Sequence, residues 1–293
     1  MNGVITKGIG GFYYVKTDDG IIECHARGKF RKLNITPMVG DNVEISLSRT
    51  EEDKGSIETI LPRKNSFIRP PVANIDNMVI TFAIETPEPN LLLVDKLTVA
   101  AVSMGVDCII CINKIDLSDE KAEEYKAIYE KTGFKVILTS STENVGTEEL
   151  KDALKGKISA LAGSSGVGKS SLINIIDPSL NLKTGDLSSK ISRGKHTTRH
   201  SELFPLSFGG FILDTPGFSS FDISLITQDN LADYFPEISK YTNLCRFNGC
   251  SHITEPDCAV KEALERSEIS QSRYESYKTL QEELKNLRLK YSN

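Results

Sequence analysis

The chain of 293 residues is long enough for two or three domains, and its 39% hydrophobic and 26% charged residues are ordinary for a soluble globular protein. A formal net charge of −5 argues against a protein that coats nucleic acid indiscriminately, although a local basic patch can still bind RNA. The chain has no run of about 18 apolar residues and does not start like a signal peptide, so we expect a cytoplasmic protein that does not contact membranes.

Residues 1–66 are expected to form a small OB-fold barrel that binds RNA. Short alternating runs such as Phe12–Val15, separated by Gly and Asp-Gly turns, predict five strands in this segment. The stretch Arg27–Lys32 places four cations and Phe30 on one expected loop, which favours phosphate attraction and base stacking. Residues 1–66 carry ten Lys and Arg against nine Asp and Glu, so a solvated loop is the alternative.

Residues 67–224 alternate between apolar runs typical of buried strands and longer stretches typical of helices. Such βαβ units predict a parallel sheet with helices on both faces, and therefore one central α/β domain. The expected strands are 77–84, 108–112, 135–139 and 157–161, and the expected helices are 90–104, 118–132, 147–154 and one that starts at residue 169.

A phosphate-binding P-loop is predicted between the last of these strands and the last helix. The sequence from Gly163 to Ser170 matches G-x-x-x-x-G-K-S in the strand–loop–helix context that the motif needs. Its glycines let backbone N–H groups converge on phosphates, Lys169 would neutralise β/γ-phosphate charge, and Ser170 would offer a hydroxyl to Mg²⁺. The expected contact residues are Gly163, Ser164, Ser165, Gly166, Val167, Gly168, Lys169, Ser170 and Ser171.

A second phosphate motif, Asp214-Thr-Pro-Gly217, follows the apolar run that ends at Leu213. It fits D-x-x-G, in which Asp214 would hold Mg²⁺ through water and the Gly217 N–H would contact the γ-phosphate. Such turns are common at strand ends, so the motif gains its weight from the P-loop that precedes it.

Base recognition is predicted for Asn113-Lys114-Ile-Asp116, at the end of an expected strand. Guanine presents two adjacent donors, N1–H and the 2-amino group, and the carboxylate of Asp116 can accept from both. Adenine has no donor at either place and would leave that carboxylate unpaired, so the motif selects guanine. Asn113 is expected to pair with the base edge and the loop, and Lys114 to cover the ring. A backbone N–H of Ser140-Ser141 is expected to reach guanine O6.

The order of these motifs is unusual, because the guanine motif precedes the P-loop. GTPases of the Ras type have the P-loop first, but a circularly permuted chain can build the same pocket, since geometry and not chain order makes a site. The segment after Asp214–Gly217 then leads directly into the C-terminal region. We hypothesise that nucleotide state moves that region as a lever. Identical positions of the region in the GTP and GDP states would contradict this.

The hydrolytic machinery is expected between residues 185 and 201, in the position of switch I. Thr197 or Thr198 would complete the Mg²⁺ shell, and the sequence does not choose between them. Phe218 stands where many GTPases carry a water-orienting glutamine, so that role passes to a partner or to another residue. His196 is the nearest candidate, and a solvated loop histidine is an equally good interpretation.

Residues 225–293 are expected to form a mainly helical domain built around a zinc ion. A Cys₃His set suits tetrahedral Zn²⁺, and because four ligands leave no open position the ion would be structural. The ligands would be Cys245, Cys250, His252 and Cys258. Leucines spaced by three and four predict an amphipathic helix within 259–291, more suited to packing than to partner binding. The other cysteines, Cys24, Cys108 and Cys111, lie in apolar runs and are expected to be small buried residues.

Together these motifs resemble the circularly permuted RsgA family of ribosome small-subunit-dependent GTPases (YjeQ/YloQ). The resemblance covers nearly the whole chain, from the barrel-like start through NKID, TSS, GSSGVGKSS, RGKHTT and DTPGF to C-x₄-C-x-H-x₅-C. It implies an N-terminal OB-fold, a permuted GTPase domain and a C-terminal zinc domain, with GTP or GDP, Mg²⁺ and one structural Zn²⁺. It also implies binding to the small ribosomal subunit and its rRNA, with subunit-stimulated GTP hydrolysis coupled to late maturation. Phe218 and His196 fit the same family pattern.

Two other functions stay open from the sequence. An RNA-binding assembly platform would use GTP structurally and hardly hydrolyse it, and ribosome-stimulated turnover would discriminate against this function. A P-loop ATPase or metabolic kinase is disfavoured, because Asn113–Asp116 selects guanine and no substrate-binding insertion is evident. Nothing in the sequence points beyond a monomer.

Overall fold

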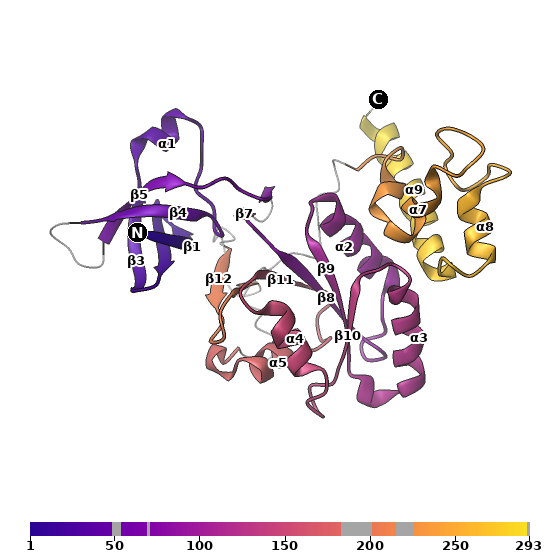
Figure 1. Ribbon diagram of the computed structural model, residues 1–293, viewed down its shortest axis with the longest axis horizontal. Coiled ribbons are helices and arrows are strands. Elements are labelled where there is room, and N and C mark those ends of the chain that lie inside the picture. Colours follow the sequence, from indigo (N-terminus) through magenta and orange to yellow (C-terminus); the bar gives the residue numbers. More distant parts are fainter. Residues whose placement is uncertain (49–53, 69–70, 183–200, 215–225, 292–293) are drawn as a thin grey trace.

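A β-barrel, an α/β region and a helical region follow one another along the chain (Figure 1). The computed structural model describes residues 1–48, 54–68, 71–182, 201–214 and 226–291. The order and type of the three regions confirm the predicted fold class. No helix in these ranges is both long and apolar enough to cross a membrane.

The N-terminal region is a closed barrel of five strands, as predicted. Neighbouring strands pair in the order β1-β2-β3-β5-β4, and β4 pairs with β1 to close the barrel. Alternate residues such as Ile22 and Cys24 point inward and meet Phe30 of a short helix in the core. The elements are β1 (Asn2–Ile9), β2 (Phe12–Thr17), β3 (Gly20–Ala26), α1 (Gly28–Lys32), β4 (Asn42–Leu47) and β5 (Lys54–Ile60).

One expectation for the barrel is wrong. The stretch around Phe30 is a helix rather than a loop, and the Phe30 ring is 5% exposed because it completes the barrel core. It cannot stack on a nucleic acid base. The exposed rings of the barrel are instead Phe12 and His25, whose centroids lie 4.4 Å apart on neighbouring strands.

The central region is a sheet with the strand order β10-β9-β8-β11-β13-β12, parallel except for the antiparallel pair β12–β13. All strands and helices predicted between residues 77 and 176 are present. The strands are β8 (Asn77–Ala83), β9 (Asp107–Asn113), β10 (Lys135–Thr139), β11 (Ile158–Ala162), β12 (Glu202–Pro205) and β13 (Phe211–Asp214). The helices are α2 (Leu91–Ser103), η1 (Ile115–Leu117), α3 (Asp119–Glu130), α4 (Thr147–Leu154), α5 (Lys169–Ile176) and η2 (Pro178–Leu180).

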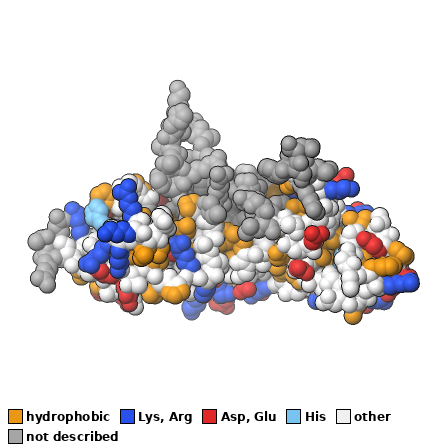
Figure 2. All heavy atoms as spheres, turned by 90° about the horizontal axis from the view of Figure 1, so that it is seen from above, with side chains coloured by type: hydrophobic (Ala, Val, Ile, Leu, Met, Phe, Trp, Pro, Cys, Tyr) orange, Lys and Arg blue, Asp and Glu red, His pale blue; other side chains and the backbone are white. Residues whose placement is uncertain are grey.

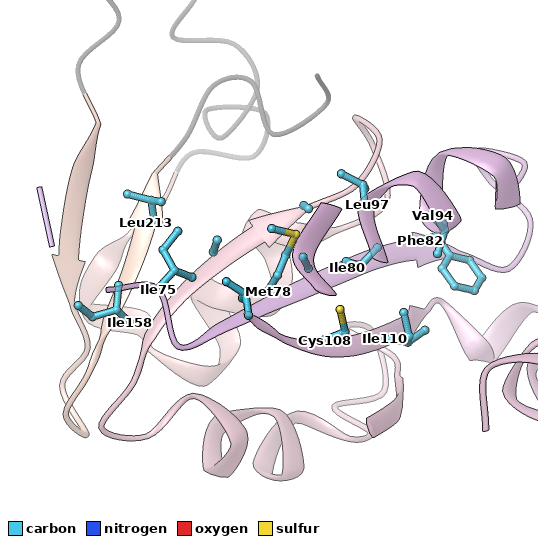
Figure 3. Close-up of a cluster of buried hydrophobic side chains, with 14 of the residues drawn as sticks. Ile75, Met78, Ile80, Phe82, Val94, Leu97, Cys108, Ile110, Ile158 and Leu213 are labelled. Carbon is cyan, nitrogen blue, oxygen red and sulfur yellow. The ribbon is translucent and has the colours of Figure 1, made fainter. Parts of the chain in front are cut away.

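The sheet is buried on both faces, which explains why its strands are apolar throughout. On one face Met78, Ile80 and Phe82 of β8 pack against Val94 and Leu97 of α2 (Figure 3). On the other face, residues of β8, β9 and β11 pack against α4 and α5. The prediction of a parallel sheet covered on both sides is confirmed.

The barrel and the central sheet are joined in two places. A hairpin of β6 (Ser66–Ile68) and β7 (Pro71–Ala73) links them along the chain. In addition, edge strand β12 pairs with β1. Lys7 and Glu202 lie opposite each other in this pair, and their side chains form an ion pair at 3.0 Å. One continuous sheet of eleven strands therefore runs through both regions.

The C-terminal region has its own core, formed by residues such as Phe235, Val260 and Tyr277. Its elements are η3 (Leu231–Tyr234), α7 (Pro236–Thr242), α8 (Ala259–Glu265) and α9 (Gln271–Tyr291). Leu280 and Leu284 of α9 are buried, which confirms the expected packing face, while Leu287 is 42% exposed. The thiols of Cys24, Cys108 and Cys111 are buried, also as expected.

Candidate functional site

The predicted P-loop lies between β11 and α5, and its glycines are required by the backbone. Gly163, Gly166 and Gly168 have φ of 129°, 81° and 99°, values that favour glycine. A Cβ at Gly163 would lie 2.0 Å from the Thr81 carbonyl oxygen, and one at Gly168 would lie 2.2 Å from Asn113 Nδ2. The loop can therefore hold this shape only with glycine at these positions.

The Lys169 ammonium lies over the P-loop. Its Nζ donates to the carbonyl oxygens of Gly163 at 2.7 Å and Ser164 at 2.6 Å. Burial lowers the pKa of Lys169 to about 8. The neighbouring Ser170 is also buried, in the first turn of α5. An anion in the loop would replace two carbonyl contacts of Lys169 with charge pairing, so binding would favour the protonated lysine.

This linkage predicts that GDP affinity falls as pH rises. Because the bound phosphates stabilise charged Lys169, binding above its pKa of about 8 requires uptake of a proton. The association constant should fall about fourfold between about pH 7 and 8.5. Equilibrium titration with a fluorescent GDP analogue measures this. In Lys169→Ala the remaining affinity should lose this slope, which separates the lysine from ionisation of the nucleotide. Equal slopes in both proteins would contradict the assignment.

The guanine motif follows β9 and is joined to the P-loop. Asn113 is fully buried, and its Nδ2 donates to the Val167 carbonyl oxygen at 2.7 Å. Its Oδ1 accepts from Thr139 Oγ1 at 3.1 Å. Lys114 adopts φ 62°, and its Nζ donates to the carbonyl oxygen of Thr86. Sequence reasoning gave no role to Thr86, because no motif marks a backbone carbonyl.

Asp116 lies beside the serine loop that follows β10. Its Oδ1 accepts from Ser140 Oγ at 2.5 Å, and this hydrogen bond is the main cause that lowers the pKa of Asp116. The residue is exposed, so a ligand can reach the carboxylate. The Ser140 N–H bonds to the Val145 carbonyl oxygen at 3.1 Å, which leaves Ser141 as the residue expected to offer an N–H to guanine.

The remaining phosphate and switch residues are only partly within the described ranges. Asp214 ends β13, which pairs with β11, so its backbone lies at the same edge of the sheet as the P-loop. His196, Thr197, Thr198 and Gly217 lie outside the described residues, and so does the segment in which the lever hypothesis places its motion. Their roles stay predictions.

The predicted metal ligands converge in the C-terminal region. Donor atoms of Cys245, Cys250, His252 and Cys258 all lie within 4.8 Å of one another. The Sγ atoms of Cys245 and Cys258 are 3.8 Å apart, and each lies 3.5 Å from His252 Nδ1. A tetrahedral zinc site with Zn–S of about 2.3 Å has sulfur–sulfur edges of about 3.8 Å and sulfur–nitrogen edges of about 3.5 Å. The donor set and spacing therefore fit one tetrahedral metal ion.

Side chains around the cluster hold the ligand loop in place. Burial by itself would raise the pKa of the Glu255 carboxylate. Hydrogen bonds from N–H groups outweigh this and lower the pKa to about 2, and these groups belong to Ser251, Ile253 and Glu255 itself. Tyr274 donates its hydroxyl to the His252 carbonyl oxygen at 2.6 Å. The loop backbone is thereby fixed by groups that do not touch the metal position.

Comparisons with known proteins point to one family, RsgA, along the chain. The RsgA N-terminal domain family matches residues 2–57, and the RsgA GTPase family matches residues 60–224. A protein of Caldanaerobacter subterraneus subsp. tengcongensis, named small ribosomal subunit biogenesis GTPase RsgA, is 52% identical over 97% of this chain and 96% of its own length. One of the same name from Ruminiclostridium cellulolyticum is 50% identical over 97% and 94%.

Two solved structures have the same architecture. The crystal structure of YjeQ from Thermotoga maritima matches with a TM-score of 0.84 and 38% identity, over 97% of this chain and 98% of that one. The structure of YloQ, described as a circularly permuted GTPase, matches with a TM-score of 0.80 and 35% identity, over 97% and 95%.

Proposed function

The chain belongs to the RsgA GTPase family, and from this premise we propose that it binds the small ribosomal subunit and couples GTP hydrolysis to the subunit's late maturation and to its own release. The bond from Asn113 Nδ2 to Val167 O carries the proposal, because it joins a guanine motif to a P-loop in permuted order. The names of the two bacterial relatives support the choice of partner.

In the proposed site, each described residue has one task. Asp116 selects guanine by accepting from two donors of the base, and Lys114 covers the ring while held by Thr86. Lys169 neutralises phosphate charge, and Ser170 with Asp214 would hold Mg²⁺, which stabilises charge on the transferring phosphoryl group when bound. The buried hydroxyl of Ser170 at the start of α5 supports this assignment.

For the hydrolytic step we propose that His196 orients the attacking water. Phe218 has no hydrogen-bonding group with which to do so. Thr197 or Thr198 would complete the Mg²⁺ shell. The proposal rests on the sequence of switch I and on the family to which the chain belongs.

We propose that the metal in the C-terminal cluster is Zn²⁺ and that it is structural. Three thiolates and one imidazole are donors that zinc prefers, and four ligands leave no position for substrate. Glu255 and Tyr274 support the ligand loop from outside the cluster.

The RNA contact is proposed on the barrel. Lys29, Arg31 and Lys32 are exposed on α1, and Lys and Arg side chains gather over the barrel, at the left of Figure 2. Beside the β1–β2 hairpin lies a cavity of about 230 Å³, lined among others by Tyr13 and Ser201. A wall that includes the Tyr13 ring suits an unstacked base. We further propose that the protein acts in the cytoplasm as a monomer.

Phosphate release from GTP, with and without purified small subunits, tests the proposed function. We expect subunits to raise turnover at least about tenfold and His196→Ala to remove most of this stimulation while GDP affinity stays unchanged. His200→Ala, a histidine of the same segment with no assigned role, should keep the stimulation. A turnover rate that stays the same when subunits are added would contradict the ribosomal role. Binding of subunits and GTP without turnover would favour an assembly platform.

A further inference from the structure

The C-terminal region is anchored on α2 of the GTPase domain by one guanidinium. Arg273 of α9 is 0% exposed. Its NH1 group donates to Asp95 Oδ1 of α2 at 2.7 Å and to Thr98 Oγ1 at 3.1 Å, and its Nε donates to Glu237 Oε1 of α7 at 2.7 Å. The guanidinium also lies over the Phe235 ring, 4.6 Å from its centroid. One side chain therefore ties three helices of two regions together.

Contacts around Arg273 make this anchor broad. Tyr129 of α3 donates to the same Asp95 oxygen at 3.0 Å, and Lys96 of α2 pairs with Glu283 of α9 at 2.8 Å. Val99 of α2 belongs to the core of the C-terminal region. In Figure 1, α2 lies between the central sheet and α9, in agreement with its contacts to β8, β9 and α9. A displacement of α9 must therefore move α2 or break buried polar contacts, which is costly.

The loop that precedes the N-terminal end of α2 lies beside the nucleotide loops. The helix starts after Asn90, whose side chain accepts from the Leu93 N–H at 3.0 Å. In the preceding loop the Thr86 carbonyl oxygen holds Lys114 of the guanine motif. Pro87 faces the P-loop, since its Cδ lies 3.8 Å from the position that a Cβ at Gly166 would take.

The space between this loop and the P-loop is almost filled. The void bounded by Pro87 to Asn90 on one side and by Gly163, Ser164 and Val167 on the other has a volume of about 10 Å³. A single water needs about 10–15 Å³ by this kind of measure. The two segments therefore face each other across a void no larger than about one water, so a shift of α2 would change the shape of the nucleotide site.

We propose that Arg273 is a positioning residue of the nucleotide site: through Asp95 it fixes α2, and α2 fixes residues 85–90 against Lys114 and the P-loop. Asp95 lies four residues from Leu91, the first residue of α2, about 6 Å along the helix. Closely packed interiors have low compressibility and transmit strain, so a shift at Asp95 would reach Leu91. The inference rests on the proposed guanine-nucleotide site. Because such coupling is reciprocal, nucleotide binding would also stabilise the contact between the C-terminal region and α2.

The test compares Arg273→Met with Thr279→Ala in the full-length, zinc-loaded protein. Thr279 is an exposed residue of α9, and its hydroxyl donates to the Glu275 carbonyl oxygen of the same helix at 2.9 Å instead of contacting α2. We expect Arg273→Met to raise the dissociation constant of GDP and the KM for GTP about tenfold, with kcat within about twofold, because uniform binding is lost. Thr279→Ala should leave all three unchanged. Arg273→Lys keeps the charge and should restore part of the affinity.

A milder variant tests the same proposal if Arg273→Met does not fold. Asp95→Asn keeps the shape and the contact to Tyr129 but weakens the pairing with Arg273, and it should raise the GDP dissociation constant about threefold. The proposal is overturned if folded Arg273→Met and Asp95→Asn bind GDP like the wild type. It is also overturned if Thr279→Ala loses as much affinity as Arg273→Met, since the effect would then be general. Loss of subunit stimulation with normal GDP affinity would concern the ribosomal role alone.

Discussion

Asp116→Asn is expected to lose high-affinity binding of GDP and GTP and to gain binding of xanthosine diphosphate. In the proposed site the carboxylate of Asp116 accepts from two guanine donors, whereas an asparagine amide can accept from one of them only. Loss of one hydrogen bond to a charged group costs about 1.5–3 kcal/mol, and the guanine donor left without a partner costs about 1–3 kcal/mol more, so the affinity should fall roughly a hundredfold to ten-thousandfold. Xanthine carries an oxygen where guanine has the 2-amino group, and the asparagine N–H can donate to it.

Titration of fluorescent GDP and of xanthosine diphosphate against both proteins measures the exchange of specificity. Ser140 Oγ can still donate to the asparagine carbonyl oxygen, so the side chain should keep its orientation. Asp152→Asn is the matched control, since Asp152 is exposed on α4, away from the motif. GDP affinity that survives in Asp116→Asn would show that Asp116 does not read the base.

Cys258→Ser is expected to leave the protein without the proposed zinc ion and to unfold the C-terminal region. Cys258 is 2% exposed and belongs both to the ligand set and to the core of that region. Structural zinc sites contribute apparent free energies of about 10–16 kcal/mol, whereas a domain is stable by only about 5–15 kcal/mol. Loss of the site is therefore comparable to the whole stability of a domain, and we expect the small core alone not to stay folded.

Metal content and limited proteolysis together measure this effect. We expect about one zinc per chain in the wild type and close to none in Cys258→Ser, with rapid cleavage in residues 226–291 and a protected barrel and GTPase domain. Cys108→Ala, which removes a buried thiol far from the cluster in the chain, should keep the metal. A variant that keeps both its zinc and its protection would contradict the structural role. GDP affinity should also fall in Cys258→Ser, because an unfolded C-terminal region could no longer hold α2 through Arg273.

The sequence by itself determined the features that depend on short spacings. The P-loop, the guanine motif at Asn113 and the Cys₃His set could be recognised because their chemistry needs fixed residue types within a few positions. The apolar runs also predicted the strands and helices between residues 77 and 176, since a strand buried on both faces must be apolar throughout. These signals are local, so they can be recognised within a short stretch of sequence without knowing which distant segments pack against it.

The tertiary structure alone decided which distant residues meet. Asn113 and Val167 are 54 positions apart, and Arg273 and Asp95 are 178 apart, so neither pair leaves a pattern in a single sequence. The burial of Phe30 and the pairing of β12 with β1 likewise depend on how separate segments pack. A side chain is buried, or finds its partner, only when packing brings another segment against it, and local chain chemistry does not encode that meeting.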